Sequence, residues 1–217
     1  MDKAFIFDLN GTMIDDMPFH INAWHHILNE ELGANLTKEQ VKSQMYGKNS
    51  ELLVRVFGEH RFSKKEMDHL SVEKEKRYQR EYRPHLQLIP GLMEFLKKAH
   101  TLKIPLAIGS AAIQFNIDFV LDNLGIRHFF KAIVSADDVN YSKPNPETYI
   151  KAAGILGIQA KNCIVFEDAP KGVEAALSAG MQSVVITLLH QSAEFSVYDN
   201  VIRYIGNYTE IAPGDLL

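Results

Sequence analysis

Short apolar runs alternate with stretches of helical period over most of the chain. The apolar runs cover Lys3–Phe7, Ile104–Ile108, Ala132–Val134, Cys163–Phe166 and Ser183–Ile186. The stretches with helical spacing cover Leu92–His100, Ile113–Leu124, Glu147–Leu156 and Val173–Ala179. Because continuous apolar strands are buried on both faces, this alternation predicts a parallel sheet with helices on each side. The predicted fold class is therefore α/β, with a doubly wound, Rossmann-like core.

One long stretch after the first apolar run breaks the alternation. Residues 16–84 contain no convincing strand, and Phe19, Ala23 and Ile27 recur at every fourth position. This spacing places them on one face of an amphipathic helix. Two residue pairs match the capping box that marks a helix start: Thr37 with Gln40, and Ser63 with Glu66. We predict that residues 16–84 form a four-helix cap domain, inserted between residues 1–15 and 85–217 of the core.

Composition and charge narrow the functional classes. The chain has 217 residues, of which 46% are apolar and 23% charged, as in soluble globular proteins. A net charge of −4 disfavours nucleic acid as a partner. The single cysteine, Cys163, excludes an intrachain disulfide framework and fits a reducing compartment.

No apolar run reaches the roughly 18 residues that a membrane span requires, and the first residues lack the pattern of a signal peptide. We expect a cytoplasmic protein without a membrane or nucleic-acid partner, either a monomer or a weak homodimer.

Reactive side chains follow three of the apolar runs. Asp8 follows the first run, Ser110 follows the second after Gly109, and Glu167–Asp168 follow the fourth. The carboxyl ends of parallel strands meet at the edge where an open α/β sheet binds its ligands. Carboxylates gathered there repel one another unless a cation neutralises them, and hard oxygen ligands suit Mg²⁺. The alternative is that Asp8 caps a helix and that Glu167–Asp168 belong to a solvated loop.

Four motifs occur in an order and at separations typical of one enzyme superfamily. They are Phe7–Thr12 (Phe-Asp-Leu-Asn-Gly-Thr), Ser110 after a strand, Ser142–Pro146 (Ser-Lys-Pro-Asn-Pro) and Glu167–Gly172 (Glu-Asp-Ala-Pro-Lys-Gly). In these motifs the chain resembles the haloacid dehalogenase superfamily, and the resemblance spans nearly its whole length. The segment Met17–Trp24 and the fourth motif are most similar to the β-phosphoglucomutase-like phosphatases. The fold that we expect on this basis has strand order 3-2-1-4-5, with the active site between core and cap.

The resemblance also implies a role for each motif residue. Asp8 would attack phosphorus and carry the phosphoryl group as an aspartyl-phosphate. Mg²⁺ would be held by Asp8, the backbone carbonyl of Asn10, Glu167 and Asp168. Ser110 would donate a hydrogen bond to a phosphoryl oxygen, and Lys143 would supply a positive charge beside Asp8. For Lys143 the alternative is an ordinary surface lysine.

Three further residues are expected to bind substrate: His20, Lys48 and Ala111. His20 matches a histidine of the phosphoglucomutase-like cap, and a histidine can assist proton transfer near neutral pH. The alternative is a packed histidine that caps the first cap helix. The mutase's cap arginine aligns best with Ser50, and Lys48 lies close to that position. Ala111 directly follows Ser110. The basic run Lys74–Arg80 has glutamates interleaved with it, so we interpret it as a solvated, ion-paired helix face.

Asn10 departs from the superfamily pattern. Phosphatases of the superfamily have an aspartate there, which protonates the leaving group and activates water. Such general acid–base catalysis is typically worth about 10²–10⁴-fold, and an amide cannot transfer the proton. Three explanations stay open. In the first, the enzyme is natural and uses leaving groups that need little protonation, such as pyrophosphate or acyl and aryl phosphates. In the second, the protein is a weakened or non-catalytic phosphate binder. In the third, position 10 carries an introduced change from aspartate to asparagine.

The leading hypothesis is a Mg²⁺-dependent phosphatase that hydrolyses a small phosphorylated metabolite through a phosphoenzyme at Asp8. The alternatives are a β-phosphoglucomutase-type phosphosugar isomerase, an inorganic pyrophosphatase and a phosphate-ligand binder without turnover. The mutase holds a second phosphate with a Lys-Asn pair just after the serine of the second motif, where this chain has Ile113 and Gln114. Because an apolar side chain cannot bind a phosphate dianion, we rank the phosphatase above the mutase.

Overall fold

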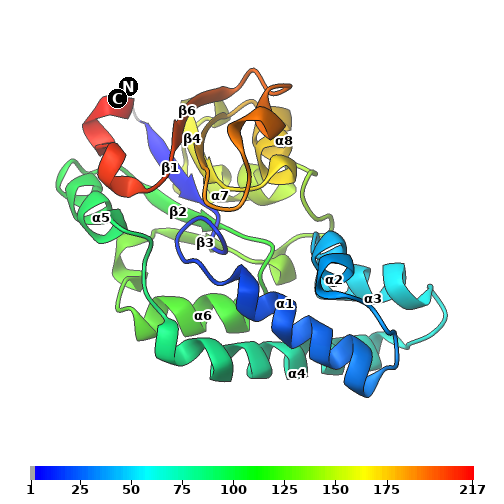
Figure 1. Cartoon of the computed structure of the whole chain (residues 1–217). Helices are drawn as coiled ribbons and strands as arrows, with labels where there is room; N and C mark the ends of the chain where they lie inside the picture. Colours follow the sequence, from blue (N-terminus) through cyan, green and yellow to red (C-terminus); the bar gives the residue numbers. More distant parts are fainter. Residues whose placement is uncertain (1–2) are drawn as a thin grey trace. The chain divides into compact units, whose positions relative to one another are not determined.

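The computed structural model describes residues 3–217, and the chain divides into two compact units (Figure 1). The core unit comprises the residues up to Asp15 together with Gln87–Leu217. The helical unit comprises Asp16–Leu86. Each unit has its own cluster of buried apolar side chains, so each is described by itself.

A parallel sheet forms the centre of the core unit. Its strands are β1 (Ala4–Phe7), β2 (Leu106–Gly109), β3 (Ala132–Val134), β4 (Cys163–Glu167), β5 (Gln182–Ile186) and β6 (Val201–Ile205). Within the described residues the sheet has six strands in the order β3-β2-β1-β4-β5-β6, and all neighbours are parallel. The predicted order of the first five strands is confirmed. The sequence pattern does not predict β6, because this edge strand exposes Ile202, Arg203 and Tyr204 and lacks a continuous apolar run.

Within the part of the core unit that the structure describes, four α-helices connect the strands. They are α5 (Leu92–Thr101), α6 (Gln114–Asn123), α7 (Glu147–Leu156) and α8 (Pro170–Ser178). Each coincides with a helical stretch predicted from the sequence. Short 3₁₀-helices cover Arg127–Phe129, Ala136–Asp138, Ala160–Asn162, Ser192–Phe195, Tyr208–Glu210 and Pro213–Leu216. α7 packs on β1, β2 and β3, whereas α8 packs on β4 and β5.

The two faces of the sheet bury different side chains, because successive strand residues point in opposite directions. On one face, the rings of Phe7 and Phe166 stack with centroids 4.5 Å apart, and Phe95 of α5 meets both edge-on. On the other face, Ile6 belongs to an apolar cluster with Tyr149 of α7. Helices therefore cover both faces of the sheet, as the sequence predicts.

The strand register determines which residues meet beyond the sheet. Phe7 of β1 pairs with Phe166 of β4, so Asp8 and Glu167 are the next residues on two neighbouring strands. On its other side Phe7 pairs with Ile108 of β2, the strand that leads into Ser110. Because the strands are parallel, all these chain segments emerge at the same edge of the sheet.

The helical unit contains four α-helices among its described residues, which is the predicted number. They are α1 (Met17–His26), continued as a π-helix over Ile27–Glu31, α2 (Lys38–Gln44), α3 (Asn49–Phe57) and α4 (Lys64–Tyr82), which a 3₁₀-helix over Arg83–His85 follows. Both predicted capping boxes form, at the starts of α2 and α4. Trp24, Leu28 and Leu53 are buried in the apolar cluster of this unit. Across residues 3–217, every helix is too short or too polar to cross a membrane.

Candidate active site

Three buried carboxylates converge beyond β1 and β4. Asp8 directly follows β1, Glu167 ends β4, and Asp168 comes next. The backbone N–H of Asp8 donates to the carbonyl of Phe166 at 3.0 Å, which extends the strand pairing by one residue. One carboxylate oxygen from each of the three residues lies within 4.8 Å of the others. The structure therefore brings together the acidic residues that the sequence places after separate strands.

Lys143 lies inside this cluster and is not a surface lysine. Its Nζ is 2.6 Å from Asp8 Oδ1 and 2.7 Å from Glu167 Oε1. Burial alone would lower the pKa of Lys143, but the charges and hydrogen bonds of Asp8 and Glu167 outweigh it and raise that pKa above its ordinary value. The side chain therefore remains a cation at neutral pH.

A carboxylate at the start of α7 holds the loop that carries Lys143. The side chain of Glu147 accepts hydrogen bonds from the backbone N–H groups of Asn140 and Tyr141, each at 3.0 Å. These bonds fix the loop two residues before Lys143 to the helix that follows it. The position of the ammonium thus depends on local structure as well as on its ion pairs.

The surroundings of Asp168 oppose its ionised form. Burial, followed by the charges of Glu167 and Asp8, raises the pKa of Asp168 well above its ordinary value, although a hydrogen bond from Thr12 and the charge of Lys143 oppose the shift. Thr12 Oγ1 donates to Asp168 Oδ1 at 3.0 Å. Gly11 makes room for this carboxylate, because a Cβ there would lie 2.3 Å from Asp168 Oδ2.

Glu167 is held by four donors. Its Oε1 accepts from Lys143 and from the hydroxyl of Tyr149, which is 2.7 Å away. Its Oε2 accepts from the backbone N–H groups of Asp168 and Ala169, both at 2.9 Å. A carboxylate offers about four lone-pair positions, so these bonds use its full capacity. Gly172 allows this packing, because a Cβ there would lie 1.7 Å from Glu167 Oε1.

Tyr149 is a site residue that the sequence analysis does not identify. Its ring is fully buried, and Lys143 Nζ lies 4.7 Å from the ring centroid. Burial, followed by the charges of Glu167 and Asp8, raises the pKa of Tyr149 well above its ordinary value, so the phenol stays protonated and donates. The available signal was a hydroxyl on an otherwise apolar helix face, six residues after Lys143.

The donor set fits a hard divalent cation. Three buried carboxylates face one ammonium, so the site has an excess of negative charge that burial makes unfavourable. Clustered carboxylate oxygens suit Mg²⁺. Asp8 and Asp168 are better placed to hold it than Glu167, whose oxygens are already engaged by four donors. Asn10 lies in the turn that follows Asp8, where Gly11 N donates to Ile14 O at 2.8 Å; the role of the Asn10 carbonyl in metal binding stays a prediction.

Comparison with known proteins identifies the family. The model of the haloacid dehalogenase-like hydrolase family matches residues 5–186, a range that contains all four motifs. The chain belongs to this family. It is thus an enzyme of a hydrolase family. Similar proteins include a phosphatase and a phosphoglucomutase, as the resemblance implies.

Individual relatives cover most of this haloacid dehalogenase-like hydrolase. A fructose-1-phosphate phosphatase of Escherichia coli is 32% identical over 186 residues, which is 86% of this chain and 97% of that protein. A β-phosphoglucomutase of Bacillus subtilis is 31% identical over 198 residues, which is 84% of this chain and 82% of that protein. The crystal structure of a β-phosphoglucomutase from Clostridium difficile superposes with a TM-score of 0.86 at 26% identity and covers 100% of this chain and 96% of that one. These comparisons confirm the predicted superfamily and the predicted fold, and they show an enzyme of the phosphatase type.

The second motif of the hydrolase lies at the same sheet edge. Ser110 is buried just beyond β2, and its backbone N–H donates to the carbonyl of Val134 at 3.0 Å. Its Oγ accepts a hydrogen bond from the N–H of Ala112 at 3.2 Å. Ala111, between them, is half-buried. Phosphate binding by Ser110 and Ala111 stays a prediction.

The two other residues predicted to bind substrate lie in the helical unit. His20 is buried, with its Nδ1 2.6 Å from Lys74 Nζ and its ring stacked on Tyr78 at 3.8 Å. Its Nε2 lies 3.2 Å from Asp16 Oδ2, so His20 is part of the packed interior of this unit. Lys48 is half-buried directly before α3, where its backbone N–H donates to Glu51 Oε2 at 3.0 Å. A role of His20 or Lys48 in substrate binding stays a prediction.

The interpretation of the basic run on α4 as a solvated, ion-paired face is confirmed for Lys76 and wrong for Lys74. Lys76 pairs with Glu73 in solvent, as expected of a solvated face. Lys74 is instead buried and lies 3.0 Å from Glu75 Oε1. The reason is its position on α4, one turn before the buried Tyr78, which places it on the inner side of the helix. Burial lowers the pKa of Lys74, and the charge of Glu75 opposes this shift.

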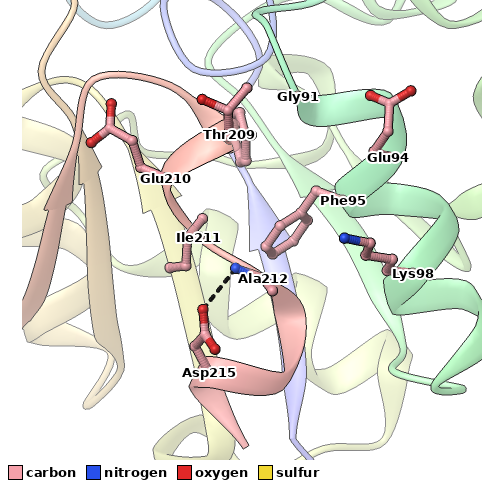
Figure 2. A pocket seen from close by; sticks show the side chains of 10 residues that line it. Gly91, Glu94, Phe95, Lys98, Thr209, Glu210, Ile211, Ala212 and Asp215 are labelled. Atoms are coloured by element: carbon pink, nitrogen blue, oxygen red, sulfur yellow. Dashed lines mark hydrogen bonds between the residues drawn. The ribbon is translucent and has the colours of Figure 1, made fainter.

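A separate pocket of about 450 Å³ lies in the core unit between α5 and the C-terminal segment (Figure 2). Phe95, Tyr208 and Ile211 contribute its apolar walls, and Glu94 and Lys98 of α5 add charged groups. The residues that line it include none of the motif residues. This pocket is therefore distinct from the acidic cluster.

Proposed function

We propose that this haloacid dehalogenase-like hydrolase is a Mg²⁺-dependent phosphatase of a small phosphorylated sugar, with Asp8 as its nucleophile. The observation that carries the proposal is the buried cluster in which Lys143 Nζ lies 2.6 Å from Asp8 and 2.7 Å from Glu167, with Asp168 beside them. The substrate class is supported by the E. coli relative, whose name states that it acts on fructose 1-phosphate.

In the first step, an oxygen of Asp8 forms a bond to phosphorus while the bond from phosphorus to the sugar oxygen breaks. Lys143 donates to Asp8 Oδ1 and so fixes the orientation of the nucleophile. Ser110 would donate to a phosphoryl oxygen. Bound Mg²⁺, which Asp8 and Asp168 would hold, offsets the negative charge of the phosphoryl group.

In the second step, water forms a bond to phosphorus and the bond to Asp8 breaks, which releases inorganic phosphate and restores the carboxylate. Both steps require a proton transfer, to the departing sugar oxygen and from the attacking water. The side-chain amide of Asn10 cannot perform either transfer, so solvent supplies and accepts the protons. We expect this to slow turnover by about 10²–10⁴-fold relative to an enzyme with a carboxylate there.

Asn10 also supports a second candidate function, a phosphate-ligand binder without turnover. Both candidates share the acidic cluster and differ in whether Asp8 reacts. A first turnover distinguishes them, because a competent Asp8 accepts one phosphoryl group even when its release is slow. Absence of this burst, with phosphate binding retained, would favour the binder.

The test is phosphate release from a panel of sugar phosphates, including fructose 1-phosphate and glucose 1-phosphate, with Mg²⁺ and with EDTA. We expect release that depends on Mg²⁺, loss of release in Asp8→Asn, and an increase of roughly 10²-fold or more in Asn10→Asp. Asp15→Asn is a matched control, since it removes an exposed carboxylate from the same segment. Equal rates in Asp8→Asn and the parent protein would refute the proposed nucleophile, and conversion of glucose 1-phosphate into its isomer would indicate the mutase instead.

A further inference from the structure

A tyrosine near the end of the chain reaches the loop that follows Asp8, here called the nucleophile loop (residues 9–14). Tyr208 is buried and begins the 3₁₀-helix Tyr208–Glu210. Its hydroxyl donates to the backbone carbonyl of Thr12 at 3.1 Å, across 196 positions of the sequence. The C-terminal segment therefore fixes a peptide group of the nucleophile loop.

Packing determines the direction in which the Tyr208 hydroxyl points. The ring lies beside Phe7, Phe95 and Phe166, with centroids 5.5–6.3 Å from its own. The backbone N–H of Tyr208 donates to the carbonyl of Pro90 at 3.0 Å. Because both the ring and the backbone are held, the hydroxyl has little freedom to follow a shift of the nucleophile loop.

The segment that supports Tyr208 is also bonded to the nucleophile loop. The N–H of Ile89 donates to the carbonyl of Met13 at 2.9 Å. Gly91 permits a close approach on its other side, because a Cβ there would lie 2.5 Å from the backbone nitrogen of Thr209 (Figure 2). The nucleophile loop, the segment before α5 and the segment of Tyr208 are therefore each bonded to the other two.

The nucleophile loop contacts both carboxylate oxygens of Asp168. Thr12 Oγ1 donates to Oδ1 at 3.0 Å, and Oδ2 lies where a Cβ on Gly11 would be 2.3 Å away. Thr12 is fully buried and β-branched, so its side chain cannot rotate freely to compensate for a change in the backbone. The orientation of the Thr12 peptide group, which Tyr208 fixes, therefore also determines where the Thr12 hydroxyl meets Asp168.

We propose that Tyr208 is a positioning residue for Asp168 and that it acts through Thr12. This inference rests on the proposed phosphatase function, in which Asp8 and Asp168 hold Mg²⁺. Without the Tyr208 hydroxyl, the peptide group of Thr12 loses this donor and the bond from Thr12 to Asp168 weakens. The carboxylate then samples orientations that do not suit the metal, and Mg²⁺ binds less tightly.

The test is a double-mutant cycle on Mg²⁺ binding, measured by titration calorimetry on the full chain after removal of divalent cations. Tyr208→Phe removes the hydroxyl and keeps the ring, whereas Thr12→Val removes the donor to Asp168 and keeps the branched side chain. Loss of a group that supports a metal ligand typically weakens metal binding by about 10–100-fold, so we expect about tenfold weaker binding for Thr12→Val and about fivefold for Tyr208→Phe. Because Tyr208 acts through Thr12, the double variant should bind within about twofold of Thr12→Val, whereas independent effects would multiply to about fiftyfold.

Two controls separate positioning from general stability. Tyr204→Phe removes an exposed tyrosine hydroxyl from β6 and should leave the Mg²⁺ affinity unchanged. Phe95→Leu removes ring packing against Tyr208 and keeps the hydroxyl that donates to Thr12. It should lower the melting temperature more than Tyr208→Phe does, yet change the Mg²⁺ affinity by about twofold or less.

Three results would overturn the inference and leave the phosphatase proposal intact. They are equal Mg²⁺ affinity in Tyr208→Phe and the parent protein, multiplied effects in the double variant, and a loss of affinity in Phe95→Leu as large as in Tyr208→Phe. Absence of Mg²⁺ binding in the parent protein would instead overturn the proposed Mg²⁺ dependence and this inference with it.

Discussion

Replacement of Lys143 by methionine tests whether the acidic cluster depends on its one ammonium group. Methionine keeps an unbranched side chain of similar length and removes two ion pairs of 2.6 and 2.7 Å. The side chains involved are at most 10% exposed, so water screens these pairs weakly. Removal of one partner from a buried ion pair costs about 3–5 kcal/mol, because the other charge stays buried without compensation. We expect a loss of this size in the free energy of unfolding at pH 7 without divalent cations.

The direction of the pKa shift of Lys143 determines the pH range over which this loss of stability should be constant. The pKa of Lys143 is raised on folding, so its contribution is fully present below the ordinary lysine pKa of about 10.4 and is lost only as the pH rises above it. Measurements between pH 7 and pH 9 should therefore give the same difference between parent and variant.

Urea unfolding followed by circular dichroism measures the effect, with EDTA and with Mg²⁺. Arg127→Met is the matched control, because it removes ion pairs of 2.6 Å whose side chains are 39–58% exposed, and water screens such pairs so that they contribute little to stability. Mg²⁺ should restore part of the stability that Lys143→Met loses, since a cation again neutralises the carboxylates. Equal losses in the two variants, or no response of Lys143→Met to Mg²⁺, would refute the reasoning.

Three further substitutions probe the same cluster. Asp168→Asn should stabilise the metal-free protein at pH 7, because the raised pKa of this carboxyl means that its ionised form destabilises the fold once the pH exceeds the ordinary aspartate value of about 3.9. Calorimetry should also show that Mg²⁺ no longer raises the melting temperature of this variant. Tyr149→Phe removes the hydroxyl that donates to the buried Glu167, so urea unfolding should show a loss of about 1–3 kcal/mol, while an unchanged stability would limit Tyr149 to packing. Gly172→Ala should lower the free energy of unfolding in urea by about 2 kcal/mol or more, because the added Cβ would lie 1.7 Å from Glu167 Oε1. Gly154→Ala, on open helix surface, should instead raise it by about 0.5–1 kcal/mol. A reversal of these signs would contradict the packing described.

The sequence predicts the sheet because its strands differ so clearly from their surroundings. Continuous apolar runs such as Cys163–Phe166 occur between helical stretches, and a parallel sheet is the arrangement that buries both. Parallel strands also bring their carboxyl ends to one edge, which is why the sequence alone predicts that Asp8 and Glu167 lie close together. The edge strand β6 lacks this signal, because Arg203 interrupts it and only one side of it is paired.

Sequence patterns do not predict which side chains from distant segments form hydrogen bonds with each other. The hydrogen bond between Tyr149 and Glu167 depends on how α7 packs against the sheet, and no local pattern encodes that pairing. The same holds for Asp137, which caps a helix in another part of the core unit. Lys74 has charged neighbours in the sequence, yet its helix turns it inward against His20. Periodicity identifies an element and its faces, whereas the partner across the interface comes only from tertiary packing.

The most direct measurement is the location of the phosphoryl group after a single turnover. The protein is mixed with fructose 1-phosphate or acetyl phosphate and Mg²⁺, quenched rapidly in acid, and mapped by peptide mass spectrometry. Phosphate should appear on Asp8 and should persist, because Asn10 cannot activate the water that removes it. Asp15→Asn should be labelled as the parent is, and Asp8→Asn should not. Release of inorganic phosphate without label on Asp8, or label on another residue, would contradict the assignment of Asp8 as the nucleophile.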